Sequence, residues 1–550
     1  MATEANPDVD PNSLDTHLLQ YLYVGQECPK YQPGNWFVHN YYYAHRVPSI
    51  AQLAEDKAKE GLPVELILKA YESKLVQNQE TLVFALAVCA RQDKSEVLRH
   101  KAYEAIKTVC QMPQHFILFV KFASQLSKQQ PDPKHGWGHG WRKAVNNWYL
   151  SKNALELAKC VTRYKGRYGW KHKDIIKLAH PAPPKDDIAM RAVLRYIAYG
   201  FKDTKSHFQQ SMDNEQLSEV IQYIENIEDF KHCEDEVRAA RLIEVHNLTL
   251  DHVPGHFLKS EEVWNALIPT MDLTTLLNNL QRMHNMGLLK SNAPGVEKIT
   301  DAISNVKSLA SEKIHPALVL ITIKNYENSG KPLSYEKRVV QQEAEKPLPS
   351  PPKPNQTIVK ALYKTLNLTL AHLEPTRLRY MVVINMNKLM LESRAWRSGN
   401  VTAAEAGCLI ALSLLRCEKT VTVATFKHIG VHVVNLDRNG TFGQAMRKLQ
   451  QAPVGTVDIS KPMSWATHQN KKYDIFINIV DQITQKLDES REAIKAYRTK
   501  MNLPNVKLVN CTMCTPAVPD VDVPDKNVLT ICGFDAGVPK IIEAFAKSLF

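Results

Sequence analysis

The pattern of hydrophobic and polar residues changes once along the chain, near residue 378. From about residue 49 to 328, apolar residues recur three and four positions apart, which is the period of an amphipathic helix. Pro63 and Pro113 stand where the first turn of a helix tolerates proline. Helices are predicted over residues 63–76, 79–91, 94–110, 113–127, 153–164, 172–180, 186–200, 214–226, 232–246, 260–268, 272–285 and 314–326. Stacked antiparallel helix pairs without a strict repeat predict an α-helical, HEAT-like solenoid.

Two segments lack this period. Residues 1–14 are polar and acidic, which predicts a disordered N-terminus and excludes a signal peptide. Residues 329–356 form a charged stretch in which five prolines crowd between residues 347 and 354, which is typical of an extended linker or exposed loop. A further helix is predicted over 358–370.

The region after residue 378 alternates short apolar runs with helical segments. Strands are predicted over 381–387, 420–426, 474–480, 506–511 and 527–534, and helices over 401–415, 442–449, 492–500 and 538–549. This alternation indicates a doubly wound α/β domain, in which helices cover both faces of a mostly parallel sheet.

Positive charge is concentrated in one stretch, residues 134–180. It holds 11 Lys or Arg and only two acidic residues, so it carries +9 of the net +12, along with four of the eight Trp. Cations neutralise phosphates, and aromatic rings stack on unpaired bases. In the helix predicted over 172–180, Lys173, Lys177 and His180 share one side, and Ile175, Leu178 and Ala179 the other. The stretch therefore predicts an RNA-binding surface; the plainer interpretation is a solvated helical face whose Trp side chains belong to the core.

Other chemistry is sparse. The ten Cys are scattered, and the single C-x-x-C pair, Cys511 and Cys514, has no second pair to complete a zinc site, which favours reduced thiols. No cluster of catalytic residues emerges, and no apolar run approaches the ~18 residues of a membrane span. We expect a soluble intracellular protein that is not an enzyme, uses no cofactor and is a monomer.

Several segments spread along the chain resemble one family. They are G-W-R-K-A-V-N-N-W-Y at 140–149, residues 164–180, E-T-L-V-F-A-L-A-V-C at 80–89, L-K-S-E-E-V-W-N-A-L at 258–267, I-H-P-A-L-V-L-I at 314–321, E-P-T at 374–376 and I-C-G-F-D-A-G at 531–537. Together they resemble the Ro ribonucleoprotein family, the SS-A/Ro autoantigens.

The resemblance implies a TROVE module over residues 15–370, whose paired helices close into a ring, and a von Willebrand A-type domain over 371–550. It implies a cytoplasmic, and also nuclear, ribonucleoprotein of RNA quality control. Y RNA-like small noncoding RNAs would bind the outer surface of the ring, and the ends of misfolded noncoding RNAs its hole.

The expected RNA-binding residues come from two sources. The family's RNA-contacting patch falls on Arg163, Arg167 and His180. Charge and position in the basic stretch add the remaining members: Arg142, Lys143, Lys165, Lys171, His172, Lys173 and Lys177. The alternative function is a helical-repeat scaffold whose basic face binds an acidic protein.

Metal-binding von Willebrand A domains carry D-x-S-x-S after the first strand, a Thr in a second loop and an Asp in a third. Here the matching positions hold Asn385, Asn387, Leu389 and Val457, and only Asp481 remains. Because Mg²⁺ needs hard oxygen ligands and a carboxylate charge, we expect no bound metal and a possible protein partner instead.

Overall fold

The computed structural model describes residues 13–34, 42–129, 137–330, 353–483, 487–517 and 525–550. These residues form two compact units. The helical unit comprises described residues of 12–27 and 36–270, and the α/β unit comprises those of 28–35 and 271–550.

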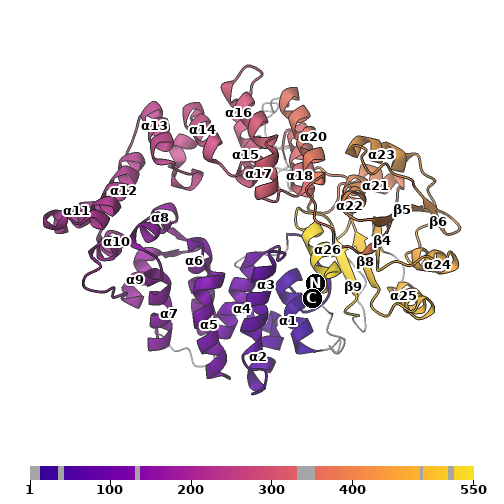
Figure 1. Ribbon diagram of the computed structural model, residues 1–550, viewed down its shortest axis with the longest axis horizontal. Helices are drawn as coiled ribbons and strands as arrows, with labels where there is room; N and C mark the ends of the chain where they lie inside the picture. The colour runs from indigo at the N-terminus through magenta and orange to yellow at the C-terminus, as the bar shows by residue number, and fades with distance from the viewer. Residues whose placement is uncertain (1–12, 35–41, 130–136, 331–352, 484–486, 518–524) are drawn as a thin grey trace, which may run out of the picture. The chain divides into compact units, whose positions relative to one another are not determined.

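The helical unit consists of packed helices, as predicted (Figure 1). Its α-helices are α1 (Leu14–Val24), α2 (Pro48–Glu55), α3 (Leu62–Ser73), α4 (Gln79–Arg91), α5 (Glu96–Val109), α6 (Pro113–Gln129), α7 (His139–Leu150), α8 (Ala154–Arg163), α9 (His172–Ala179), α10 (Ile188–Tyr199), α11 (Phe201–His207), α12 (Glu215–Lys231), α13 (Glu236–His246) and α14 (Glu261–Leu267). A two-stranded hairpin, β2 (Gly166–Arg167) with β3 (Trp170–Lys171), lies between α8 and α9.

Helix pairs hold this unit together. Helix α4 is the centre of its first part: residues 81–90 are all buried, and α3, α5 and α6 pack around it. Later, α8 packs on α10 and α12, and α13 on α14. Phe84 and Phe122 meet edge to face with ring centroids 5.1 Å apart, an arrangement that the ring quadrupoles favour. The helical part of the predicted fold is confirmed.

The α/β unit begins with helices and continues into a sheet (Figure 1). The helices before the sheet are α15 (Leu273–Asn285), α16 (Pro294–Ile303), α17 (Val306–Ser311), α18 (Pro316–Glu327) and α20 (Gln356–Leu370). The strands are β1 (Lys30–Tyr31), β4 (Arg379–Ile384), β5 (Thr420–Phe426), β6 (Val431–Val433), β7 (Ile475–Val480), β8 (Lys507–Thr512) and β9 (Val528–Cys532). The helices among and after these strands are α21 (Lys388–Glu392), α22 (Ala403–Cys417), α23 (Phe442–Gln450), α24 (Lys461–His468), α25 (Leu487–Met501) and α26 (Val538–Ala546).

The sheet has the order β1-β9-β8-β7-β4-β5-β6 and is parallel except for β6, which runs antiparallel to β5. Its two faces are covered by different helices. On one face, the backbone of Gly407 in α22 approaches Ile384 and Ile479 so closely that an added Cβ would lie 3.1 Å from each. On the other face, Met381 and Phe476 pack in a buried cluster with residues of α24 and α25. Burial on both faces explains why the strands read as continuous apolar runs.

Strand β1 was not predicted. It adds residues from the N-terminal part of the chain to the edge of the sheet, where Lys30 and Tyr31 pair in parallel with Thr530 and Ile531. The Tyr31 hydroxyl donates a 2.7 Å hydrogen bond to the Asp535 carboxylate, whose pKa is raised by burial. The G-F-D-A-G motif therefore has a structural role in this unit.

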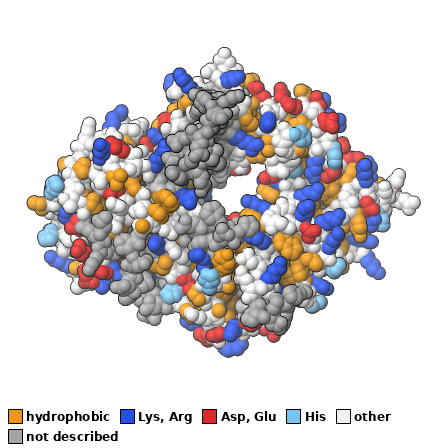
Figure 2. Space-filling view, turned by 180° about the vertical axis from the view of Figure 1, so that it is seen from behind, with side chains coloured by type: hydrophobic (Ala, Val, Ile, Leu, Met, Phe, Trp, Pro, Cys, Tyr) orange, Lys and Arg blue, Asp and Glu red, His pale blue; other side chains and the backbone are white. Residues whose placement is uncertain are grey.

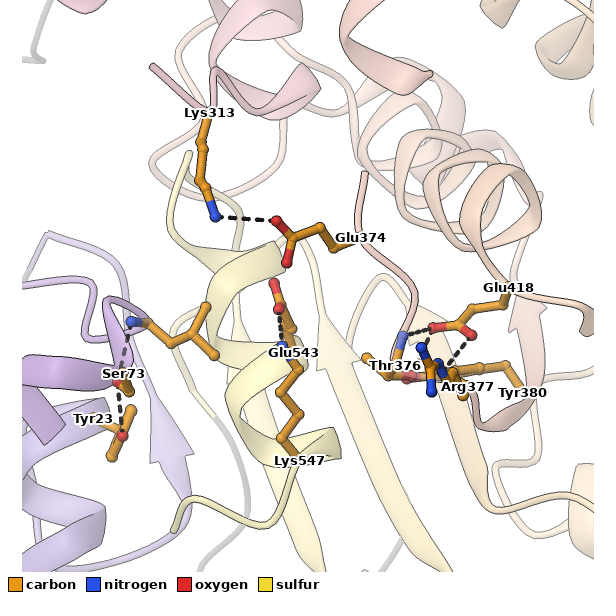
Figure 3. A network of polar contacts seen from close by, with 11 residues as sticks. Tyr23, Ser73, Lys313, Glu374, Thr376, Arg377, Tyr380, Glu418, Glu543 and Lys547 are labelled. Atoms are coloured by element: carbon orange, nitrogen blue, oxygen red, sulfur yellow. Dashed lines mark hydrogen bonds and ion pairs between the residues drawn. The ribbon is translucent and has the colours of Figure 1, made fainter. Parts of the chain in front are cut away.

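The E-P-T motif is also structural (Figure 3). Glu374 forms a 3.0 Å ion pair with Lys313 of the helical segment before the sheet. The Thr376 hydroxyl and the Arg377 backbone N–H donate to the two oxygens of buried Glu418, at 2.6 and 2.9 Å. A buried carboxylate is tolerated when its oxygens are satisfied in this way.

Two expectations fall largely outside the described residues: most of the segment 1–14 and the proline-rich segment, of which 331–352 is not described. Within the described part of the chain, no helix is both long enough and apolar enough to cross a lipid bilayer.

Candidate nucleic-acid interface

The basic stretch folds into α7, α8, the β2–β3 hairpin and α9, all within the helical unit. Helix α7 packs on α9, α8 packs on α12, and the hairpin rests on α6. In Figure 2, Lys and Arg side chains gather on the part of this unit that holds α7 to α12, at the right of the view. The local charge predicted from sequence is therefore displayed on a folded surface.

Two of its four tryptophans belong to the core rather than to this surface. Trp148 is fully buried, and its ring stacks on Phe116 with centroids 3.9 Å apart. The indole N–H of Trp148 donates a 2.7 Å hydrogen bond to the carbonyl of Cys110. Trp141 is only 4% exposed. The plainer interpretation of these two rings is correct, and only the half-buried Trp137 and Trp170 remain near the surface.

His172 is likewise an interior residue. Its side chain is 2% exposed, and Nδ1 lies 2.8 Å from the hydroxyl of buried Tyr149. Burial lowers the pKa of the imidazole to about 4, so the ring is neutral at pH 7. The expectation that His172 offers its ring to RNA is therefore corrected: it fixes the start of α9, which carries the exposed cations.

Helix α9 presents a basic side to solvent. Lys173, Lys177 and His180 are exposed, as their spacing predicted. The packed side differs from the prediction by one residue, since Ile176 is buried and Leu178 is 40% exposed. His180 ends the helix in the left-handed conformation, with φ 53°, and its backbone N–H donates to the Ile176 carbonyl at 2.9 Å. The end of this basic side is thus held in place by the C-cap.

The hairpin carries the next group of exposed cations, Lys165, Arg167 and Lys171. Tyr168 and Gly169 form its turn with φ of 54° and 81°, the combination of a type I′ turn. A Cβ on Gly166 would lie 2.6 Å from the Trp170 carbonyl. Gly166 and Gly169 therefore serve the backbone of the hairpin itself.

Helices α7 and α8 contribute unequally. Arg142 and Lys143 are exposed on α7. Between α7 and α8, Lys152 is turned inward: its ammonium lies 3.6 Å from the centroid of the Trp148 ring and donates to the Trp148 carbonyl, and burial lowers its pKa. Arg163 forms a 2.7 Å ion pair through Nε with Asp251, a residue 88 positions further along the chain. Arg163 is therefore only partly available to a phosphate.

The fold also adds residues that spacing within the basic stretch did not indicate. A pocket of about 330 Å³ is lined by Lys165, Lys171 and Lys173 from the stretch, but also by Lys231 of α12 and by Tyr199 at the end of α10. Tyr199 and Lys231 lie outside the basic stretch, which ends at residue 180, and no local sequence signal connects them with it.

Comparison with known proteins identifies the family. The TROVE domain family matches residues 51–386, more than half of the chain, and the Ro60 vWA domain matches residues 379–546. The chain belongs to the Ro ribonucleoprotein family. The Ro family member of Caenorhabditis elegans, RNA-binding protein RO60, is 25% identical, with 98% of this chain and 88% of the relative covered. RNA-binding protein RO60 of Deinococcus radiodurans is 24% identical, with 88% of this chain and 85% of the relative covered.

A solved structure confirms the Ro fold. The crystal structure of the Deinococcus radiodurans RO protein aligns with a TM-score of 0.81 and 22% identity, covering 98% of this chain and all of the other. The succession of packed helices followed by a von Willebrand A-type domain, predicted from the sequence, is therefore shown.

The residues at the family's metal position in the α/β unit do not suit Mg²⁺. Asn385 donates through Nδ2 to Oδ1 of Asp481 at 2.8 Å, so the amide takes up the carboxylate oxygen that a metal would need. Asn387 accepts a hydrogen bond from the Met390 backbone at the start of α21, and Leu389 is 44% exposed. Among the described residues, no group of three or more His, Cys, Asp or Glu is placed to hold a metal ion.

We expect Mg²⁺ to leave the thermal stability of the RNA-free protein unchanged. An ion that binds only the folded state at a hundredfold excess over its Kd would add about 2.7 kcal/mol. Melting curves in millimolar Mg²⁺ and in EDTA should therefore coincide. As a positive control, the combined variant N385D, N387S, L389S and V457T should acquire a Mg²⁺-dependent increase in melting temperature. A clear increase in the unaltered protein would contradict the assignment.

Proposed function

We propose that the exposed cations of α7, the β2–β3 hairpin and α9 bind structured small noncoding RNA, and that the protein acts by binding without catalysis. The observation that carries this proposal is the display of Arg142, Lys143, Lys165, Arg167, Lys171, Lys173, Lys177 and His180 on one folded region of the helical unit. Phosphate neutralisation by such side chains supplies most of the affinity of proteins for nucleic acid. Relatives covering most of the chain are named RNA-binding proteins, which supports the same conclusion.

The finer parts of the proposal rest on the family likeness. They are recognition of Y RNA-like RNAs on the outer surface of a ring, capture of misfolded RNA ends in its hole, and a cytoplasmic and nuclear location. All ten cysteines are free thiols, which supports a reducing compartment. Crosslinking in native extract, followed by sequencing of the bound RNA, tests which RNAs are held.

We expect RNA binding to depend steeply on salt. Each neutralised phosphate releases counterions, so log K should fall with log salt by roughly 0.9 per contact for duplex and 0.7 for single-stranded RNA. Contact by five or more of the exposed cations therefore predicts a slope of about −4 or steeper. Filter binding of a small stem-loop RNA across a salt series measures it. Absence of RNA binding, together with salt-dependent capture of an acidic protein, would favour the scaffold function instead.

A further inference from the structure

A cavity lies within the α/β unit, between α22 and α26 and next to the start of α18. Its volume is about 80 Å³, and it is separate from the basic surface of the helical unit. An apolar cavity of ~150 Å³ accepts one benzene molecule, so this one has room for a smaller group, such as a branched chain of roughly four or five carbons. A helix or a strand does not fit into it.

The wall of the cavity is mainly apolar. Helix α22 contributes Leu409, Ile410 and Leu414, and helix α26 contributes Pro539 and Ile542. Leu409, Ile410 and Ile542 are at most 4% exposed, so the cavity reaches into the core of the unit. Transfer of an apolar group from water to such a wall is favourable, whereas water inside it finds few polar partners. The wall therefore favours a ligand with an apolar body.

His315 supplies a hydrogen-bond donor at one side of the cavity. It precedes α18 and accepts the Ala317 backbone N–H on Nδ1 at 3.0 Å. Burial lowers the pKa of the imidazole to about 3, so the ring is neutral at pH 7 and its single proton lies on Nε2. Within the described part of the chain, Nε2 has no hydrogen-bond partner. The ring is therefore ready to donate to an acceptor in the cavity.

Ser413 of α22 supplies a second polar group to the wall. Its side chain is 8% exposed, and among the described residues its buried hydroxyl has no hydrogen-bond partner. A serine inside a helix often bonds the carbonyl four residues earlier, but this one does not, and an unsatisfied buried hydroxyl is costly. A ligand oxygen would satisfy it, because the hydroxyl hydrogen rotates to suit its neighbour. In so small a cavity, Ser413 and His315 are both within reach of one ligand.

The charged residues of the lining favour a neutral ligand. They are three acids without any Lys or Arg, namely Glu374, Glu418 and Glu543, and they would repel an anion. Glu374 forms an ion pair with Lys313, and Glu543 forms one with Lys547 (Figure 3). The oxygens of Glu418 are occupied by the hydrogen bonds of the E-P-T segment. Because these carboxylates already have partners, a cation would gain little from them.

We propose that this cavity binds a small neutral molecule with a branched apolar body and one carbonyl oxygen, which accepts hydrogen bonds from His315 and Ser413. The wall joins α22 and α26 to the start of α18, so a bound molecule would contact all three. Binding would therefore stabilise the α/β unit, and it would not require RNA.

Titration of the RNA-free, full-length protein with methyl isopropyl ketone tests the proposal, with the isoleucine methyl groups isotopically labelled. The NMR signals of Ile410 and Ile542, which line the cavity, should shift with a Kd on the order of 1 mM, as expected for about six non-hydrogen atoms. Isobutyrate has nearly the same shape but is an anion, and the amine of the same carbon skeleton is a cation. Both should bind at least about tenfold more weakly. Equal or tighter binding of either ion, or unshifted Ile410 and Ile542 signals with the ketone, would overturn the proposal.

Two conservative variants test the donors separately from the apolar wall. His315→Asn keeps a side-chain oxygen to cap α18 but removes the ring N–H, and Ser413→Ala removes only the hydroxyl. Each should weaken ketone binding roughly three- to tenfold, the usual contribution of one hydrogen bond, with little change in melting temperature. Ser464→Ala, at an exposed position of α24, is the matched control and should leave binding unchanged. Undiminished ketone binding in both His315→Asn and Ser413→Ala would overturn the assignment of the carbonyl oxygen.

A blocking variant tests the place of binding. Ser413→Leu adds a branched apolar side chain at the wall of the cavity, and it should abolish the ketone-induced shifts at Ile410 and Ile542 without lowering the melting temperature. Ketone binding that persists in a folded Ser413→Leu protein would show that the ligand lies elsewhere and would overturn the site.

Discussion

Combined substitution of Arg163, Arg167 and His180 is expected to weaken binding of a structured small RNA by several kcal/mol. Each phosphate or stacking contact is worth ~1–3 kcal/mol. Arg163 is partly engaged by Asp251, so Arg167 and His180 should account for most of the loss. His180 has φ 53° at the end of α9, where alanine is strained, so His180→Asn is the better change alongside R163A and R167A. Filter binding at fixed salt measures the effect.

The control for this variant removes positive charge elsewhere. Lys360, Lys364 and Lys419 are exposed residues of the α/β unit, and their replacement by alanine also lowers the net charge. This control should keep most of the affinity. The free energy of unfolding of the interface variant should lie within about 1 kcal/mol of the parent's. An exposed ion pair such as Arg163–Asp251 contributes only ~0–1 kcal/mol to that stability. Equal loss of affinity in both variants would show that only net charge matters, and would refute the localised surface.

Trp148→Ala is expected to destabilise the helical unit by about 3–5 kcal/mol, the usual cost of removing a large buried aromatic ring. The substitution removes the stack on Phe116 and leaves the Cys110 carbonyl without its 2.7 Å donor. Hydrogen exchange in the intact protein should accelerate in α6 and α7, which carry the two stacked rings. Trp148→Phe, which keeps a ring against Phe116, should recover much of the loss.

The same variant distinguishes a core tryptophan from an RNA-stacking one. RNA affinity of the folded fraction should change little, because the indole is fully buried. A Trp148→Ala protein that keeps the parent's exchange rates but loses RNA binding would show that the indole reaches RNA.

The sequence by itself determined the fold class and most of the elements. Predicted helices such as 79–91 match α4 to the residue, and the five predicted strands are all present. The spacing of apolar residues within each segment is enough to predict these elements, because each one buries a continuous face against its neighbours. Helix α7 was missed although Trp141, Ala144, Val145 and Trp148 have helical spacing, because flanking glycines and cations obscured the pattern.

Short strands whose position depends on residues far away in the sequence could not be predicted from local spacing. Strand β1 is two residues long and has no period of its own, and its place is set by β9, some 500 residues later. The hairpin β2–β3 likewise gave no alternating pattern, and its left-handed turn residues became evident only in the folded chain.

The sequence also determined where the charge lies, but only the tertiary structure decided which cations and rings face outward. Lys173 and Lys177 are exposed, whereas Lys152 lies over the Trp148 ring and His172 is buried. Residue type and local charge do not distinguish the exposed members of this set from the buried ones. Their difference arises from packing between helices that are separated in sequence, which a local pattern does not encode. The same packing brings Tyr199 and Lys231 to the lysines of the basic stretch, and so makes a pocket out of what the sequence presents as a run of charge.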